Sequence, residues 1–259
     1  MPLIDPITMS SLSPSGKAGA AQAAKPKEAD APSQAIRTLP SAQAQAVRHT
    51  HPALLLSCFL LFFPALVTDP VATMWSSVPA VLCLQAAYTI LSLPAVGAAA
   101  VKPVKKLRPG EKKKAGDGAG PNIAVTTLVA FVLSLASAIP LHVMLVLFGA
   151  PFLTHLPHTF LVSLHLSLLG LFPLFYTRGV GGQAWLEILS ARAPFDEAFG
   201  GLVGACVGAW LGAVPIPLDW DREWQKWPVT ILAGVYAGYV LGKTIGGTVA
   251  FGTRFGGQR

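Results

Sequence analysis

The chain has 259 residues, of which 53% are hydrophobic and only 12% are charged. Soluble domains carry about 25% charged residues, so this composition is typical of a membrane protein. The 19 Lys and Arg residues outnumber the 12 Asp and Glu residues, but they cluster in loops and tails beside apolar segments. No basic stretch is interleaved with aromatic residues, so the excess positive charge gives no indication of nucleic-acid binding.

Residues 1–50 form the first distinct segment and are rich in Ala, Ser, Pro, Gln and Lys. A segment with so few large apolar side chains cannot bury enough surface to offset the entropy lost on ordering. We therefore expect residues 1–50 to be a disordered tail. The segment has no apolar core near its start, so we expect no secretory signal.

Four apolar segments follow, and each is close to the 20 or so helical residues that cross a bilayer core. Residues 52–67 and 71–101 form a predicted hairpin, and residues 123–148 and 157–176 form a second pair. The basic segment 101–122 separates the two pairs and is expected to be a solvated loop. A glycine-rich connector, residues 178–197, then holds an amphipathic piece that is typical of a helix at the membrane interface.

The last two predicted spans, residues 198–214 and 229–248, carry glycine at every fourth position. Residues four apart lie on the same face of an α-helix, so each span presents a face without side chains. In lipid, small residues let two helix backbones approach closely, and this contact holds membrane helices together. The glycines predicted to form this contact, here called the glycine ladders, are Gly200, Gly204, Gly208, Gly212, Gly234, Gly238, Gly242 and Gly246.

These segments predict an all-α, polytopic membrane protein. Residues 51–250 should form a six-transmembrane-helix bundle in which spans five and six make the glycine-ladder hairpin, followed by a short tail at 251–259. Six spans place both termini, the 101–122 loop and the connector on one side. That side holds 17 of the 19 Lys and Arg residues, all except Arg222 and Lys226. By the positive-inside rule it is expected to be cytosolic.

The distribution of chemically active residues argues against catalysis inside the membrane. All 12 acidic residues fall in predicted tails, loops or turns, and no HExxH, GxSxG or P-loop motif is present. The Asp-rich helical signature of CDP-alcohol phosphotransferases is also missing. The three cysteines, Cys58, Cys83 and Cys206, lie in apolar segments and have no disulfide or metal-ligand spacing. We therefore predict no catalytic residue, no metal and no cofactor.

Two histidines are candidate polar residues within the bilayer. His142 and His165 lie in the third and fourth predicted spans, and a simple hairpin places both rings at similar depth. A pair of rings that face each other could share a proton or hold a ligand. The alternative, which we favour, is an interhelical hydrogen bond to a serine such as Ser137, Ser163 or Ser167.

The turn between the ladder helices is polar and rich in tryptophan. Indole rings favour the headgroup level, so its tryptophans are expected to anchor the turn at the interface. Two carboxylates in the turn could instead bind a divalent ion, and the turn as a whole could dock a partner protein. The candidate residues of this turn are Asp219, Trp220, Asp221, Arg222, Trp224 and Trp227.

Three stretches around this turn resemble the phosphatidylinositol-glycan biosynthesis class F family (PIG-F), in particular its fungal members. They are Phe195-Asp-Glu-Ala-Phe-Gly-Gly, the stretch from Gly208 to Pro228, and Gly234-Val-Tyr-Ala-Gly-Tyr-Val-Leu-Gly. The resemblance is specific over residues 195–246. Over the first four spans it extends only to the layout of apolar segments, and the first 50 residues show no resemblance.

The resemblance implies a protein of the endoplasmic reticulum membrane that acts in GPI-anchor assembly. It implies a large partner, the catalytic subunit of a GPI ethanolamine phosphate transferase, which this chain would stabilise without catalysing a reaction itself. A small lipid or solute transporter, or a flippase-like protein in contact with membrane lipid, is the alternative. A transporter more often shows a broken helix or an intramembrane charge at its binding site. An independent enzyme is the third reading.

Overall fold

The computed structural model describes residues 33–98, 121–218 and 220–255, and these are helices and their connections without a strand. Five helices are long and apolar enough to cross a membrane. The chain is therefore an all-α membrane protein, as its composition predicts. The predictions for residues 1–32 and 99–120, for Asp219 and for residues 256–259 lie outside the described residues.

The first two helices, α1 (Ala42–Thr68) and α2 (Pro70–Ser92), form the predicted hairpin. Asp69 joins them, and its carboxylate accepts a hydrogen bond from the Ala72 amide, which caps α2. Helix α2 ends nine residues before the predicted end at residue 101. The cause is Pro94, because a proline disfavours helical backbone at the residue that precedes it, and Leu93 is extended.

The start of α1 also differs from the predicted boundary at residue 50. The helix begins at Ala42, where the Ser41 hydroxyl accepts a hydrogen bond from the Ala44 amide at 3.2 Å. Before it, an extended segment contacts the rest of the molecule: the Leu39 amide donates to the Ser92 carbonyl at 2.8 Å. Residues 33–50 are thus ordered, because their backbone groups find partners in sequence-distant elements.

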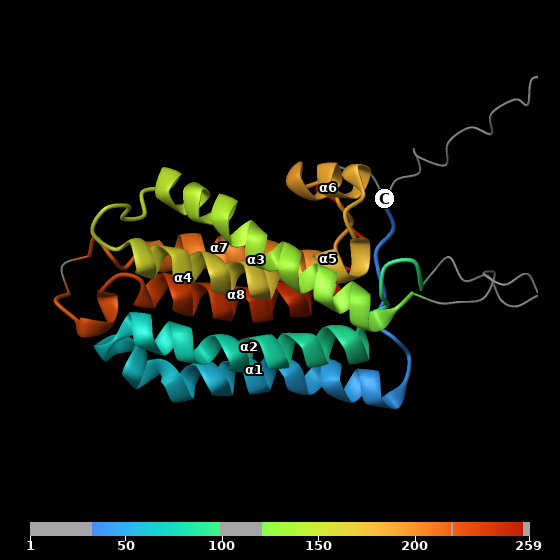
Figure 1. Cartoon of the computed structure of the whole chain (residues 1–259), viewed down its shortest axis with the longest axis horizontal. Helices are drawn as coiled ribbons and strands as arrows, with labels where there is room; N and C mark the ends of the chain where they lie inside the picture. Colours follow the sequence, from blue (N-terminus) through green and yellow to red (C-terminus); the bar gives the residue numbers. More distant parts are fainter. Residues whose placement is uncertain (1–32, 99–120, 219, 256–259) are drawn as a thin grey trace, which may run out of the picture. The chain divides into compact units, whose positions relative to one another are not determined.

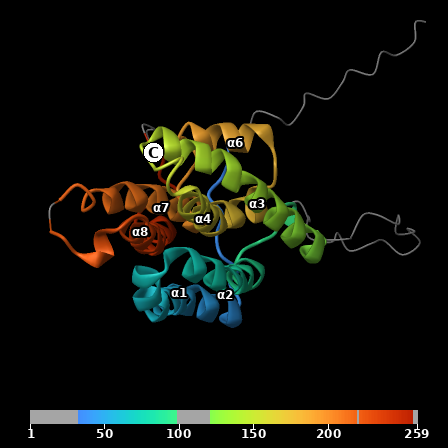
Figure 2. The same cartoon turned by 60° about the vertical axis from the view of Figure 1, so that its left-hand side comes forward.

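Helix α3 (Ile123–Leu147) is followed by a continuous helix, Leu156–Arg178, that lies at the centre of the bundle. This central helix consists of α4 (Leu156–Leu166), the π-helical turn η2 (Ser167–Leu171) and α5 (Phe172–Arg178). In its most apolar stretch of 18 residues, 89% of the stretch is buried inside the bundle, whereas the corresponding share is 17% in α1 and in α3. The α1–α2 pair and α3 lie on opposite sides of α4, α7 and α8 (Figures 1 and 2).

The remaining helices are α6 (Gly182–Leu189), α7 (Glu197–Ala213), the short η3 (Glu223–Gln225) and α8 (Val229–Gly247). Helix α7 has 17 residues and is shorter than the five long apolar helices. At 1.5 Å per residue its length is about 26 Å, slightly less than the bilayer core of about 30 Å. The fifth predicted span is therefore present as a helix at the lower limit of spanning length.

The π-helical turn has a cause in the sequence. Pro173 has no amide hydrogen, so the carbonyl of Leu169, four residues earlier, loses its helical partner. The side chain of Gln85 in α2 replaces it, because its Nε2 donates to the Leu169 carbonyl at 3.0 Å. Gln85 has no exposed surface, and its Oε1 accepts a hydrogen bond from the Tyr239 hydroxyl at 3.2 Å. One glutamine thus connects α2, the central helix and α8.

Candidate functional site

The structure places α7 and α8 in backbone contact along the glycine ladders. A Cβ atom built on Gly204 would lie 2.7 Å from the Cα of Gly242, and one on Gly208 would lie 2.9 Å from the Cα of Gly238. A Cβ on any of the eight ladder glycines would overlap a backbone carbonyl of the opposite helix or, for Gly246, of its N-cap residue Asp196. A side chain at any of these positions would therefore force the two backbones apart.

A buried charged cluster lies where the ladders end, at the start of α7. Glu197 is 5% exposed, and its Oε2 accepts a hydrogen bond from the Tyr88 hydroxyl at 2.6 Å. Arg48 of α1 forms an ion pair with the same carboxylate. Lys243 of α8 is 2% exposed, and its Nζ lies 4.0 Å from Glu197 Oε2. The four side chains join α1, α2, α7 and α8 at one end of the bundle.

Two further contacts fix Lys243 within this cluster. Its ammonium lies 3.6 Å from the centroid of the Tyr88 ring, a cation–π contact, and 3.2 Å from Nδ1 of His51. The sequence pattern does not predict this cluster, because Glu197 falls at the end of the connector and Lys243 falls near the polar end of the last span. The one signal was a lysine inside an apolar glycine-rich helix, which must find a partner when buried.

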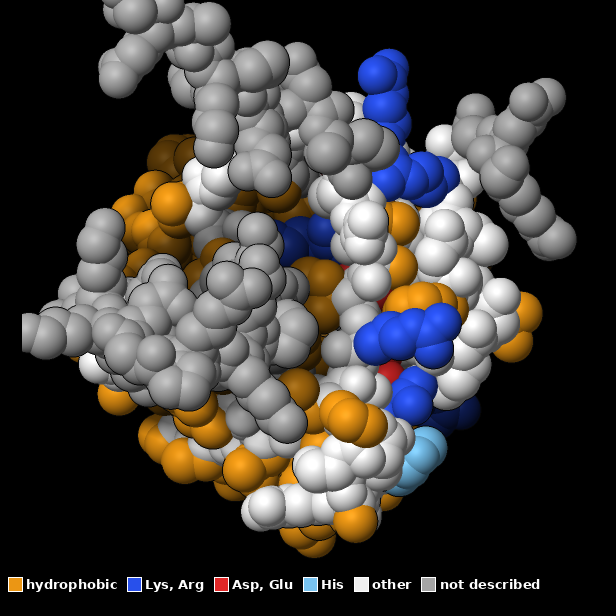
Figure 3. Space-filling view, turned by 90° about the vertical axis from the view of Figure 1, so that its right-hand side faces the viewer, with side chains coloured by type: hydrophobic (Ala, Val, Ile, Leu, Met, Phe, Trp, Pro, Cys, Tyr) orange, Lys and Arg blue, Asp and Glu red, His pale blue; other side chains and the backbone are white. Residues whose placement is uncertain are grey.

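A second group of ion pairs ties the extended segment 33–41 to the same end. Asp196, the N-cap residue of α7, pairs with the buried Arg178 and accepts a hydrogen bond from the Ile36 amide at 3.2 Å. Glu187 of α6 accepts hydrogen bonds from the amide and hydroxyl of Ser33. This end carries six of the eight Lys and Arg side chains in the described residues, and Figure 3 views it directly.

Acidification should release the extended segment 33–41. Burial raises the pKa of Glu187, but hydrogen bonds from Ser33 and the charge of Arg254 oppose this effect, and the pKa is lowered overall. A carboxyl group with a lowered pKa stabilises the fold above its unfolded value of about 4.3, and this contribution is lost as pH falls through the folded-state pKa. Hydrogen–deuterium exchange of residues 33–41, corrected for the intrinsic effect of pH, should accelerate in that range.

Glu187→Gln is the control for this prediction. The variant has no carboxylate at this position, so exchange in residues 33–41 should already be faster at pH 7 and should lose its acid-dependent step. An acid-dependent step that persists unchanged in Glu187→Gln would assign the effect to another group.

The two candidate histidines are not brought together as a pair. In His165, Nδ1 lies 2.8 Å from the Tyr236 hydroxyl and Nε2 lies 3.2 Å from the Met74 carbonyl oxygen. His142 instead packs near Phe152 and Phe160, with ring centroids 6.5 and 6.2 Å away. Each nitrogen of His165 has a partner on another helix, so the ring links α4 to α2 and α8.

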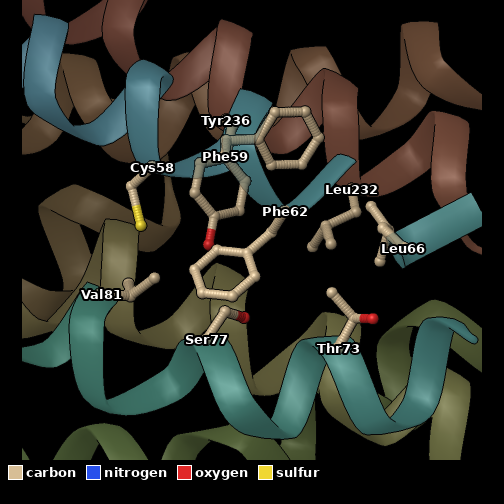
Figure 4. A pocket seen from close by; sticks show the side chains of 9 residues that line it. All are labelled: Cys58, Phe59, Phe62, Leu66, Thr73, Ser77, Val81, Leu232 and Tyr236. Carbon is tan, nitrogen blue, oxygen red and sulfur yellow. The ribbon is translucent and has the colours of Figure 1, made fainter. Parts of the chain in front are cut away.

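A small cavity lies next to this histidine link. Its volume is about 10 Å³, which is about the space of one water molecule. Side chains from α1, α2 and α8 surround it, among them Cys58, Ser77 and Tyr236 (Figure 4). The cavity is too small for a ligand, so we assign the region around His165 a structural role.

His165→Leu should lower the free energy of unfolding by about 1–3 kcal/mol, because it leaves the buried Tyr236 hydroxyl and Met74 carbonyl without their partner. His142→Leu should have little effect, since in the described residues no hydrogen bond to the His142 side chain is lost. Thermal unfolding midpoints of the two purified variants in the same detergent test this difference. Equal midpoints would show that the His165 bonds contribute nothing.

The polar turn between α7 and α8 is organised around Gln225. Its Nε2 donates to the carbonyls of Pro215 and Leu218, both at 2.8 Å, and its Oε1 accepts from the Arg222 amide at 3.0 Å. Trp220 and Trp224 are exposed, with ring centroids 5.9 Å apart. Of the remaining candidates, Asp221 and Arg222 are exposed and Trp227 packs against the core.

These features define a class of protein. The long helices expose apolar side chains, such as Leu61 at 82%, and the most tightly packed pair makes contact through its backbones. In the described part of the chain, no group of three or more His, Cys, Asp or Glu side chains is placed to hold a metal ion. The protein is a multi-pass, all-α membrane protein. It belongs to the GPI biosynthesis protein family Pig-F, whose family model matches residues 50–247.

Individual relatives extend this result. The chain is 51% identical to glycosylphosphatidylinositol anchor biosynthesis protein 11 of Neurospora crassa, over 98% of this chain and 100% of the relative. It is 37% identical to the protein of the same name from Aspergillus fumigatus, over 91% and 90% of the two chains. The human GPI ethanolamine phosphate transferase, stabilizing subunit, is 39% identical over 41% of this chain and 50% of that protein. No solved structure matches the chain.

Proposed function

We propose that this chain is a non-catalytic subunit of GPI-anchor biosynthesis in the endoplasmic reticulum membrane. It stabilises the transferase that adds ethanolamine phosphate to a mannose of GPI. The observation that carries this proposal is the similarity to the human protein named as the stabilizing subunit of that transferase. The packing of the described helices supports it, because the ladder hairpin is a rigid pair of helices that can present fixed outer faces to a partner.

Co-purification tests the proposal. The tagged full-length chain, solubilised from its own membranes in a mild detergent, should retain the large catalytic subunit of a GPI ethanolamine phosphate transferase in about equal amount. An unrelated tagged multi-pass protein of the same membrane serves as the control. Recovery of the chain without the transferase, under conditions that preserve other membrane complexes, would contradict the proposal and favour an independent transporter.

We further propose that α7 counts as the fifth of six spans. This places both termini and the basic loop 101–122 in the cytosol and the α7–α8 turn in the lumen. The proposal rests on the positive-inside rule and on the six basic residues that gather at one end of the described residues. Protease added to sealed microsomes should cut within residues 105–114 and spare the 214–228 turn. Protection of the loop until detergent is added would reverse the orientation.

The exposed tryptophans of this turn give the proposed docking surface for the partner. Trp220 is 52% exposed and its ring lies tilted beside that of Trp224, so the pair can enter a pocket or the headgroup layer without rearranging α7 or α8. The double variant Trp220→Ser, Trp224→Ser should accumulate normally but retain less of the transferase. Full retention of the transferase would leave the two residues with a membrane-anchoring role only.

A further inference from the structure

An apolar cleft of about 700 Å³ lies between α3 and α7. One wall is the carboxyl end of α3, with Met144 and Phe148, and the other is the face of α7 that carries Cys206, Trp210 and Ala213. The polar turn closes one end with Ile216, Pro217 and Trp227. The cleft is separate from the charged cluster and from the ladder contact.

The sequence of α3 explains why the cleft opens on this side. The buried residues of α3 are small and fall at every fourth position, Ala130, Ser134 and Ala138, so the first part of the helix can approach its neighbours. Beyond Pro140 the residues that face the core are Leu141 and Leu145, whose side chains are larger than those of Ala130, Ser134 and Ala138. Toward its carboxyl end α3 accordingly moves away from α4 and α7 (Figures 1 and 2).

The apolar lining of the cleft indicates which kind of molecule can bind there. The lining is almost wholly apolar and lies within the helical part of the bundle, so in a bilayer a hydrocarbon group is favoured over water. The glycine faces that would admit a close helix contact are already used between α7 and α8. A flexible acyl chain can follow such an apolar lining without a close backbone contact.

The turn end of the cleft adds a polar feature. The Trp227 side chain lines the cleft, and its Nε1 is buried and donates to no group in the described residues. Arg222 is an exposed residue of the same turn, five positions before Trp227 in the sequence, and it forms no ion pair with the described residues. An indole N–H and a guanidinium group are both donors to a phosphate oxygen, and both are common at the headgroup level.

We propose that this cleft binds a membrane glycerophospholipid. One acyl chain lies between α3 and α7, and the phosphate lies at the end of the cleft that Trp227 lines, where Arg222 can also approach it. The proposal goes beyond the role as a stabilising subunit, since a bound lipid would form part of the folded chain with or without a partner. It also assigns Trp227 a ligand in place of a simple anchoring role.

Photo-cross-linking in native membranes tests the proposal. The probe is a phosphatidylcholine with a diazirine in one acyl chain, incorporated into membranes that contain the full-length protein. Label should concentrate in the peptides that span residues 144–151 and 206–217. Ala213→Phe fills the cleft from the α7 wall and should lower this labelling about tenfold, equivalent to a loss of about 1.4 kcal/mol. Ala237→Phe, on an exposed part of α8 outside the cleft, should leave it unchanged.

A second cleft variant tests the proposal if the first fails to accumulate, and a second probe tests the role of the phosphate. If Ala213→Phe fails to accumulate, Met144→Trp fills the cleft from the opposite wall and should give the same loss. Arg222→Gln should reduce labelling by the phospholipid probe but not by a diacylglycerol with the same diazirine chain. Equal labelling along the exposed face of α1, or labelling unchanged in both cleft variants, would overturn the proposal. Transferase retention measured in the same samples tests the stabilising role separately.

Discussion

Gly208→Leu should abolish accumulation of the protein in the membrane, and Gly238→Leu should do the same. A Cβ on Gly208 would already overlap the Gly234 carbonyl and lie 2.9 Å from the Cα of Gly238, so a leucine side chain has no room. Overpacking a core normally costs about 1–3 kcal/mol because side chains can shift. Here the obstacle is backbone, and the cost should exceed that range because α7 and α8 must separate. Quantitative immunoblotting of microsomes measures the loss.

Two variants serve as controls for this result. Val207→Leu adds one methylene to a side chain that neighbours Gly208 and is 50% exposed, so the protein should accumulate normally. Gly182→Ala places a methyl group where nothing lies within 4 Å, and it should be neutral. Normal accumulation of Gly208→Leu and Gly238→Leu would show that the ladders are not packing faces.

Glu197→Gln should destabilise the protein by about 3–5 kcal/mol, the cost of leaving a buried charge without its partner. The substitution removes the carboxylate that faces Lys243 and Arg48 but keeps the size of the side chain. Adding Lys243→Met should recover part of the loss, because the unpaired ammonium is then absent as well. Thermal unfolding in detergent, together with the amount of protein in microsomes, measures both steps.

The same substitution at an exposed ion pair is the matched control. Glu223 pairs with Lys226 in the polar turn, and both side chains are largely exposed. Exposed pairs contribute little because water and salt already screen both charges. Glu223→Gln should therefore leave the unfolding temperature nearly unchanged. Equal effects of Glu197→Gln and Glu223→Gln would show that the buried cluster does not stabilise the bundle.

The parts of the fold that were predicted correctly depend on local sequence patterns. The long apolar segments predicted the membrane class. The spacing of glycines from Gly200 to Gly246 predicted which faces of α7 and α8 would meet, because i and i+4 positions define a helix face without further information. The end of α2 was placed too late, although Pro94 was a local signal for it. The start of α1 was also placed too late, although Ser41 is a typical capping residue.

The remaining features depend on contacts between residues far apart in the sequence. In the sequence Gln85 is an isolated polar residue in an apolar helix. Its role depends on Pro173, which leaves the Leu169 carbonyl without a helical partner so that the Gln85 side chain can donate to it. Glu197 and Lys243 could each be assigned to a solvated end, because no rule of spacing joins α7 to α1 and α2. The partner of His165 was likewise a tyrosine and a backbone carbonyl on other helices, where the favoured prediction was a serine.

The central claim, that the chain stabilises an enzyme rather than acting as one, is tested most directly by removing the chain from cells. The amount of the transferase catalytic subunit and its turnover rate per molecule should be measured before and after depletion. We expect the amount to fall and the rate of each remaining molecule to stay the same, with both restored by the wild-type chain and neither by Gly208→Leu. An unchanged amount of transferase with a lower rate per molecule would contradict this account.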